Sequence, residues 1–221
     1  MDILDKDIPR IRRRILTWGR ANHKHFPWRK TTKLWHGLIA EILLQRTRAA
    51  TAVSIYEQFI SNFPEPKDLA SASVKEIEKL IYPLGLRWRA PLLKQLGEEL
   101  DRLGGEPPPS FEQLLKLPGV GPYAAAAWLS FHGGGRGVII DANVVRWICR
   151  LIDRKCDAET RRKKWLIQLA DRLTPQRSSG EFNYAVLDFT MEICATRPKC
   201  SVCPVGAELC AYGKRVLLKE L

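Results

Sequence analysis

The chain has 221 residues, of which 45% are hydrophobic and 27% are charged. This composition is typical of a globular protein, so it excludes a wholly disordered chain and allows one or two compact domains. Lys and Arg total 36 against 24 Asp and Glu, which gives a formal net charge of +12. A charge of this size favours a polyanionic partner, most commonly nucleic acid, although a basic surface without a partner stays open.

Neither the N-terminus of the chain nor its longest uncharged run indicates a membrane protein. The first 16 residues place arginines inside their only apolar stretch, which is not the pattern of a secretory signal. Residues 117–135 carry no Asp, Glu, Lys or Arg, but prolines and glycines interrupt this run. A single helix there could not span a bilayer, so we expect an intracellular protein of the cytoplasm or nucleoid.

Helical periodicity dominates the sequence, and only residues 137–140 have a β-like composition. Capping residues precede two of the expected helices, Ser73 with Glu76 in the first case and Ser110 with Gln113 in the second. The pattern predicts helices at 8–20, 34–62 (one long helix or two abutting ones), 74–81, 88–103, 111–117, 123–131, 143–154, 158–173 and 181–193. The expected fold is therefore all-α, with two helical lobes that separate near residues 27–32 and 133–137.

Four of the six cysteines crowd into the C-terminal part of the chain, at Cys194, Cys200, Cys203 and Cys210. Clustered thiols without a secretory signal indicate a metal site, not a disulfide framework. Their spacing alone suits either a [4Fe–4S] cluster or a structural zinc ion. The other two cysteines stand apart; Cys149 lies on an apolar helical stretch and should be buried, whereas Cys156 should be a surface thiol.

The segment Leu117–Gly121, with the sequence LPGVG, separates two expected helices. Glycines at positions 119 and 121 allow a positive φ and a close approach of the backbone to a partner. Their amides, together with those of Val120 and of the next helix N-terminus, form a suitable nest for a phosphate. An ordinary helix–helix turn is the alternative, but such a turn needs at most one glycine.

Six motifs in a fixed order give this chain its most specific signal. They are FPWR at 26–29, AEILLQRT at 40–47, LPGVGPY at 117–123, VIIDANVVR at 138–146, FNYAVLDF at 182–189 and the terminal cysteines. Together they resemble the helix–hairpin–helix superfamily of base excision DNA glycosylases, the relatives of endonuclease III. The resemblance is strongest to the branch that holds MutY-type adenine glycosylases and archaeal thymine mismatch glycosylases.

This resemblance implies a domain organisation and a cofactor. Residues 30–134 would form a six-helix barrel-like domain with the helix–hairpin–helix, and residues 1–29 with 135–221 a helical iron–sulfur domain. The four clustered cysteines would hold a [4Fe–4S] cluster with a structural role. Their spacing here is C-x5-C-x2-C-x6-C, whereas family members usually have C-x6-C-x2-C-x5-C. One residue has thus moved from the first gap to the last, which changes the loop more than the ligands.

Glu41 is the only charged residue between Leu34 and Gln45. A carboxylate on an apolar helix is costly to desolvate, and this environment suits a general acid that protonates a leaving base or activates water. The residues alone leave a Glu on the solvent face equally open. The resemblance implies that Glu41 is the catalytic glutamate.

Asp141 precedes an amphipathic helix and is a preferred N-cap residue. A fixed carboxylate there could also stabilise the cationic sugar of an oxocarbenium-like transition state, which is the role that the resemblance implies. Asn143 and Arg146 would contact backbone phosphates. Gln45, with Arg46 beside it, would fill the hole that a flipped-out nucleotide leaves.

Tyr123 stands where bifunctional relatives carry a lysine that forms a Schiff base with the sugar. A phenol cannot form that adduct, so the resemblance implies a monofunctional enzyme that leaves an abasic site. Packing against the hairpin is the alternative role for Tyr123. Trp28, Trp35 and Trp88 could stack on bases, but helical spacing favours core packing for them. The sequence assigns no role to the histidines at 36 and 132.

Two features favour thymine or uracil opposite guanine, in duplex DNA, as the target. We expect the enzyme to be a monomer. The chain stops soon after Cys210, whereas MutY-type enzymes usually carry a further domain, and it reads Arg87-Trp88-Arg89 where they have paired tyrosines. Adenine opposite guanine or 8-oxoguanine is the runner-up. A non-catalytic module that senses lesions is the third reading, and the intact set of Glu41, Tyr123 and Asp141 speaks against it.

Overall fold

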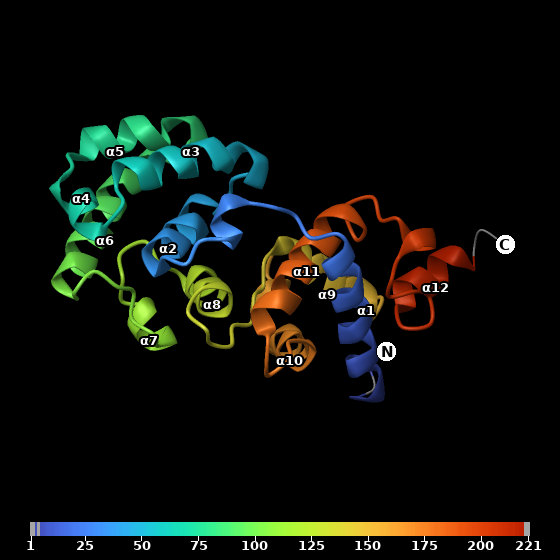
Figure 1. Ribbon diagram of the computed structural model, residues 1–221. Helices are drawn as coiled ribbons and strands as arrows, with labels where there is room; N and C mark the ends of the chain where they lie inside the picture. Colours follow the sequence, from blue (N-terminus) through green and yellow to red (C-terminus); the bar gives the residue numbers. More distant parts are fainter. Residues whose placement is uncertain (1–2, 4, 219–221) are drawn as a thin grey trace. The chain divides into compact units, whose positions relative to one another are not determined.

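The computed structural model describes residue 3 and residues 5–218 of the chain. The described residues form helices and no β-strand, which confirms the all-α prediction (Figure 1). The α-helices are α1 (Ile8–Ala21), α2 (Leu34–Leu43), α3 (Ala49–Asn62), α4 (Pro66–Ser71), α5 (Val74–Ile81), α6 (Ala90–Arg102), α7 (Phe111–Leu114), α8 (Pro122–Phe131), α9 (Ala142–Leu151), α10 (Lys164–Leu173), α11 (Ser179–Glu192) and α12 (Ala211–Leu217). Within the described part of the chain, no helix has both the length and the apolar character needed to cross a membrane.

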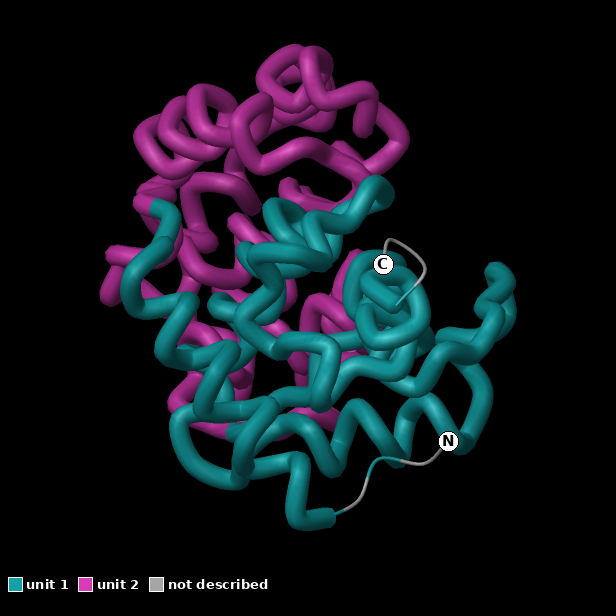
Figure 2. The backbone as a smooth tube through the Cα atoms, turned by 90° about the vertical axis from the view of Figure 1, so that its right-hand side faces the viewer, with its two compact units in different colours: residues 1–24, 136–221 teal, residues 25–135 magenta. Residues whose placement is uncertain are grey.

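The chain forms two compact units (Figure 2). One comprises residues 25–135, and the other combines residues 1–24 with residues 136–221. The first unit contains α2 to α8, and the second contains α1 and α9 to α12. The assignment of a barrel-like domain and an iron–sulfur domain to these parts of the chain stays a prediction.

The unit of residues 25–135 is built on one apolar core, in which α2 packs against α8 and α6 packs against α4 and α5. Trp28 and Trp35 are buried, as the spacing predicted, and the Trp35 Nε1–H donates to the carbonyl of Phe63 at 3.2 Å. Trp128 Nε1–H donates to the Leu34 carbonyl at 2.9 Å and so ties α8 to the start of α2. The core prediction is wrong for Trp88, which is 61% exposed.

Of the two alternatives for residues 34–62, one long helix or two abutting ones, the structure shows two helices: α2 ends at Leu43 and α3 begins at Ala49. Arg46, in the turn between them, has a φ of 63°, a left-handed conformation that a helix cannot contain. The buried Arg89 donates from Nη1 to the Ile42 carbonyl at 2.6 Å and satisfies the C-terminus of α2. This stop depends on a contact with a distant residue, so local periodicity did not reveal it.

The two predicted capping residues are confirmed. Ser73 Oγ accepts from the Glu76 amide at 3.2 Å, and Glu76 Oε2 accepts from the Ser73 amide at 2.7 Å, which completes a capping box at α5. Ser110 Oγ accepts from the Gln113 amide at the start of α7. Side chain and backbone lie within three residues of each other at both caps, which is why the sequence alone predicted them.

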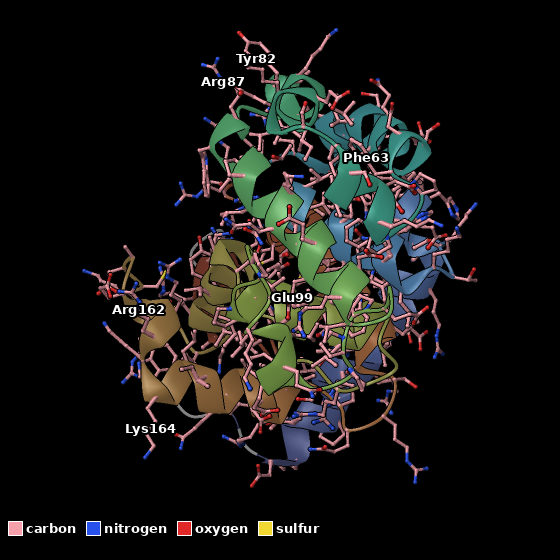
Figure 3. The ribbon with its side chains drawn as sticks, turned by 90° about the vertical axis from the view of Figure 1, so that its left-hand side faces the viewer. Phe63, Tyr82, Arg87, Glu99, Arg162 and Lys164 are labelled. Carbon is pink, nitrogen blue, oxygen red and sulfur yellow. The ribbon has the colours of Figure 1, made fainter. Side chains whose placement is uncertain are left out.

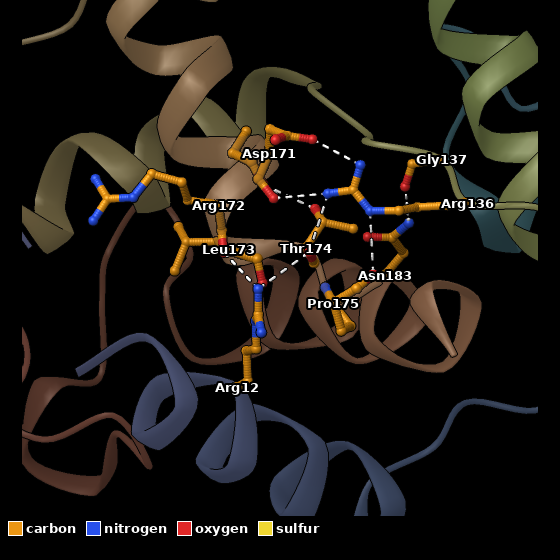
Figure 4. Close-up of polar contacts among 10 residues, drawn as sticks. Arg12, Arg136, Gly137, Asp171, Arg172, Leu173, Thr174, Pro175 and Asn183 are labelled. Atoms are coloured by element: carbon orange, nitrogen blue, oxygen red, sulfur yellow. Dashed lines mark hydrogen bonds and ion pairs between the residues drawn. The ribbon is translucent and has the colours of Figure 1, made fainter. Parts of the chain in front are cut away.

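In the other unit, two arginines bind the C-terminal carbonyl groups of α10 (Figure 4). Arg12, from α1, donates to the carbonyls of Leu173 at 2.9 Å and Thr174 at 3.3 Å, and also to that of Arg172. Arg136 donates to the Asp171 carbonyl at 2.8 Å and pairs with the Asp171 carboxylate at 2.7 Å. Cations at this end of a helix satisfy unpaired carbonyls and oppose the negative end of its dipole.

We expect Arg12→Ala to lower the free energy of unfolding by about 2 kcal/mol, because it removes charged hydrogen bonds to carbonyls at the end of α10. Denaturant unfolding followed by circular dichroism measures the change. Arg13→Ala is the matched control, since Arg13 is an exposed neighbour on the same helix, and it should be neutral. Equal stability of the two variants would contradict a capping role for Arg12.

Candidate active site

The LPGVG segment forms the turn between α7 and α8. Gly119 has a φ of 76°, which confirms the prediction of a positive φ at this position. The same prediction is wrong for Gly121, which has a φ of −93° and a ψ of 175°, an extended conformation open to any residue. The Val120 side chain is buried and its amide donates to the Leu117 carbonyl at 3.2 Å, so that amide serves the turn itself.

The amides of Gly119 and Gly121 have no acceptor among the residues that the structure describes. A Cβ built on Gly121 would meet no atom within 4 Å, so the backbone there is open to close approach by a ligand. The N-terminus of α8 follows directly at Pro122. These features suit a phosphate group, which is the partner expected of this turn.

Glu41 lies in the last part of α2 and is 4% exposed, so the solvent-face alternative is excluded. Its Oε1 lies 3.8 Å from Nε2 of His132, which follows α8 and whose side chain is also 4% exposed. The two polar side chains are thus both buried and lie close to each other. Sequence reasoning gave no role to His132, because nothing in the local pattern connects residues so far apart along the chain.

Tyr123 is the second residue of α8 and is half-buried, in the same unit as Glu41. It follows the Gly119 turn directly, so its backbone is fixed next to the proposed phosphate nest. Both its catalytic role and the packing alternative stay predictions.

Asp141 belongs to the other unit, where it is the N-cap of α9 as predicted. Its Oδ1 accepts from the Val144 amide at 2.7 Å, and its Oδ2 accepts from the Asn143 side chain at 2.9 Å. Asn143 Oδ1 in turn accepts from Arg146 Nη1 at 3.0 Å. Arg146 also donates to the carbonyls of Thr190 and Cys194, so its guanidinium links α9 to the end of α11. A contact of Arg146 with a phosphate stays a prediction.

Gln45 and Arg46 were expected on the helix of Glu41, within the helical stretch predicted at 34–62. They lie instead in the turn after α2. Gln45 is half-buried and Arg46 is exposed. The position of Gln45 just beyond a buried helix end is compatible with insertion into DNA, and that role stays a prediction.

Exposed aromatic residues beside arginines mark another surface of the same unit. Tyr82 is 59% exposed and lies under the Arg87 guanidinium, 5.0 Å from ring centroid to Cζ. Figure 3 shows the two side chains together at the surface. Trp88 contacts the guanidinium of Arg89 in the same manner, at 4.9 Å. The exposed rings of Tyr82 and Trp88 suit stacking on bases, and the exposed Arg87 suits contact with a phosphate, whereas Arg89 is buried.

The four clustered cysteines line one pocket, in the unit that contains α9 and α12. The rest of its wall is mainly apolar and includes Trp147, Phe189, Ile193 and Val205. Burial, and to a smaller extent the other three thiols, raise the pKa of Cys210 to about 11, although the hydrogen bond from the Gly213 amide lowers it. Metal binding at this pocket would therefore have to displace protons from the thiols.

Two arginines of α9 hold the loop that carries the first cysteine. Arg150 donates to the carbonyls of Ala195 at 2.6 Å and Thr196 at 2.9 Å, and lies 3.6 Å from Cys194 Sγ. The Gly213 amide donates to Cys210 Sγ at 3.4 Å. N–H groups directed at sulfur are a usual feature of iron–sulfur sites. Sequence reasoning missed Arg150, although its spacing of four from Arg146 places both on one helix face.

The four cysteines share one pocket, and their thiols suit either a [4Fe–4S] cluster or a single zinc ion. Among the described residues, no group of three or more His, Cys, Asp or Glu side chains is arranged around one metal ion. A structural zinc requires four ligands at about 2.0–2.3 Å from one point. In a [4Fe–4S] cluster each thiolate binds a different iron, so the four cysteines have to line one pocket, as they do here.

Comparison with known proteins places the chain in a family. Residues 39–170 match the HhH-GPD superfamily base excision DNA repair proteins. The thymine/uracil-DNA glycosylase of Pyrobaculum aerophilum is 39% identical over 218 residues, which cover 95% of this chain and 94% of that protein. The structure of a thermostable thymine-DNA glycosylase superposes with a TM-score of 0.88 at 35% identity, over 95% of this chain and 98% of the other. The adenine DNA glycosylase of Rattus norvegicus is 32% identical over 95% of this chain but only 43% of its own length.

The chain therefore belongs to the HhH-GPD superfamily of base excision DNA repair proteins. This confirms the resemblance drawn from the six sequence motifs. The similarity extends over nearly the whole length of the thymine/uracil-DNA glycosylase and over less than half of the adenine DNA glycosylase.

Proposed function

We propose that the protein is a monofunctional DNA glycosylase that removes thymine or uracil opposite guanine and leaves an abasic site. The observation that carries the proposal is the burial of Glu41 at the end of α2, in a chain that matches a thymine/uracil-DNA glycosylase along nearly its whole length. A module that only binds lesions has no use for a desolvated carboxyl group, which costs stability.

In this proposal, the two carboxyl groups have different tasks. Glu41 transfers a proton to the departing base or takes one from the attacking water, because an apolar site favours such exchange. Asp141 stays fixed by the Val144 amide and the Asn143 side chain, and its carboxylate stabilises the positive charge that develops on the sugar. Water then forms the new bond at the sugar carbon as the bond to the base breaks.

Tyr123 decides whether the DNA strand is cut. Strand cleavage by β-elimination needs an amine that forms an imine with the sugar, and the residue after the Gly119 turn is a phenol. We expect no covalent adduct when the protein is treated with borohydride and a T:G duplex, whereas Tyr123→Lys should gain weak trapping. An adduct of the unchanged protein as abundant as that of a known lyase would contradict the monofunctional reading.

We propose that the protein is a monomer that binds duplex DNA inside the cell, in the cytoplasm or nucleoid. The Gly119 turn and α8 N-terminus would hold one phosphate, and Asn143 and Arg146 would contact others. Gln45, beside Arg46, would fill the space left by the flipped nucleotide. The exposed Trp88 offers a ring for stacking on a base next to the lesion.

We expect Gly119→Val to weaken binding to mismatched and fully paired duplexes alike, by about tenfold, because phosphate contacts carry no sequence information. A β-branched residue at a φ of 76° distorts the turn. Fluorescence anisotropy with both duplexes measures the change. Gly104→Val is the matched control, since Gly104 has a φ of 93° in another loop with open space around it. Equal losses in both variants would show that backbone strain alone lowers affinity.

We propose that Cys194, Cys200, Cys203 and Cys210 hold a [4Fe–4S] cluster. The shared pocket, the N–H groups directed at Cys194 and Cys210, and the family support this. The cluster would act as a structural crosslink that orders the C-terminal loop when bound. The shift of one residue between the first and last gaps leaves all four thiols on the pocket wall.

A panel of labelled duplexes tests the proposed function. T:G, U:G, A:G and A:8-oxoguanine duplexes are incubated with the protein, and alkali then cleaves any abasic site. We expect release from T:G and U:G. Release confined to the adenine duplexes would favour the runner-up, for which the similarity to adenine DNA glycosylases is the supporting observation. Binding without any release would favour the non-catalytic reading.

A further inference from the structure

We infer that His132 is a positioning residue for Glu41. The inference rests on the proposed function, in which Glu41 is the group that exchanges a proton. His132 would donate its Nε2–H to Glu41 Oε1 and fix the carboxyl group, so that Oε2 is left for the reaction. A neutral imidazole can make this bond in one of its two tautomers.

The backbone of His132 is held in place. Its amide donates to the Trp128 carbonyl at 2.8 Å, which ends α8, and the Gly133 amide donates to the same carbonyl. Trp128, one helical turn earlier, is bonded to the Leu34 carbonyl at the start of α2. These contacts fix the register of α8 against α2, and with it the distance between His132 and Glu41.

A glycine on α2 makes room for the ring. Gly37 lies one turn before Glu41, and a Cβ built there would come within 2.6 Å of His132 Cδ2 and 2.7 Å of Nδ1. Glycine inside a helix costs about 1 kcal/mol relative to alanine. The ring contact explains this glycine, because any larger residue would push the imidazole away from the carboxyl group.

The Nε2 atom of His132 is free to donate a hydrogen bond to Glu41. Nε2 of His132 is buried and has no hydrogen-bond partner within the described part of the chain, and Glu41 Oε1 lies 3.8 Å away. A buried polar atom without a partner costs free energy. Hydrogen bonds between catalytic groups are often long before the substrate binds and shorten in the complex. A small rotation of the carboxyl group would close this one.

The closing experiment compares single-turnover base release and DNA affinity on a T:G duplex. His132→Phe keeps the ring shape without a donor, and we expect the rate to fall about tenfold to a hundredfold with affinity unchanged. His132→Gln restores a donor and should recover most of the lost rate. Gly37→Ala displaces the ring by a second route and should also slow the reaction. His36→Gln is the control, because His36 lies on α2 with Glu41 but its Nε2 bonds to the Pro64 carbonyl.

A nitrogen-15 spectrum of the histidine rings separates this inference from the proposed function. Glu41→Gln should move the His132 Nε2 resonance, whether or not the protein releases a base. An unmoved resonance, a wild-type rate in His132→Phe, or a His132→Gln variant as slow as His132→Phe would each overturn the positioning role. A moved resonance in a protein that releases no base from any duplex would support the pairing and defeat the proposed function instead.

Discussion

Glu41→Gln is expected to lower the single-turnover rate of base release from a T:G duplex by about a thousandfold. Positioned acid–base groups contribute roughly 10²–10⁴ to enzymatic rates, and the amide can neither give nor take the required proton. The side chain is buried and nearly the same size as glutamine, so the fold and the affinity for DNA should be unchanged. Rate and affinity are measured on the same duplex, by rapid quench and by anisotropy.

Glu57→Gln is the matched control for this variant. Glu57 is an exposed residue of α3 in the same unit, so its loss of charge should leave the rate unchanged. A Glu41→Gln protein that releases the base at the wild-type rate would remove Glu41 from the chemistry. Equal slowing in both variants would point to a general effect of net charge on DNA binding.

Cys203→Ser is expected to remove most of the bound iron and the brown colour of the purified protein. An iron–sulfur cluster needs its four thiolates, and a serine hydroxyl is a poor substitute for one of them. Because metal binding contributes directly to folding, the unit with α9 to α12 should also become less stable, as seen by a lower melting temperature. Elemental analysis and visible absorbance measure the first effect, and calorimetry the second.

Cys156→Ser is the control, since Cys156 is an exposed thiol that does not line the pocket. Its iron content and colour should equal those of the wild type. One zinc and no iron per chain in the wild-type protein would contradict the cluster and favour a structural zinc site in its place.

The sequence predicted features whose causes are local. The helix starts at Ser73 and Ser110 depend on residues within three positions of the cap, and both are confirmed. A break between two helices was one alternative for residues 34–62, but its position after Leu43 was not predicted, because the buried Arg89 that caps α2 is distant in the sequence. The short helices α4 and α12 were missed as well, since six or seven residues give too little periodicity.

The same distinction holds for the candidate site. Periodicity left the orientation of Glu41 open, and only the packing of α2 shows that it is buried. The approach of His132 and the hold of Arg150 on the Cys194 loop depend on helix packing, which pattern alone does not reveal. Gly121 shows the reverse error, because a glycine in a turn suggested a positive φ that the backbone there does not adopt.

The most direct measurement is mass spectrometry of both products after the protein is incubated with a T:G duplex without alkali. We expect free thymine together with a full-length strand that carries one abasic site. We expect the same outcome for uracil in a U:G duplex. A cleaved strand would contradict the monofunctional mechanism, and free adenine from an A:G duplex with no thymine release would contradict the assigned substrate.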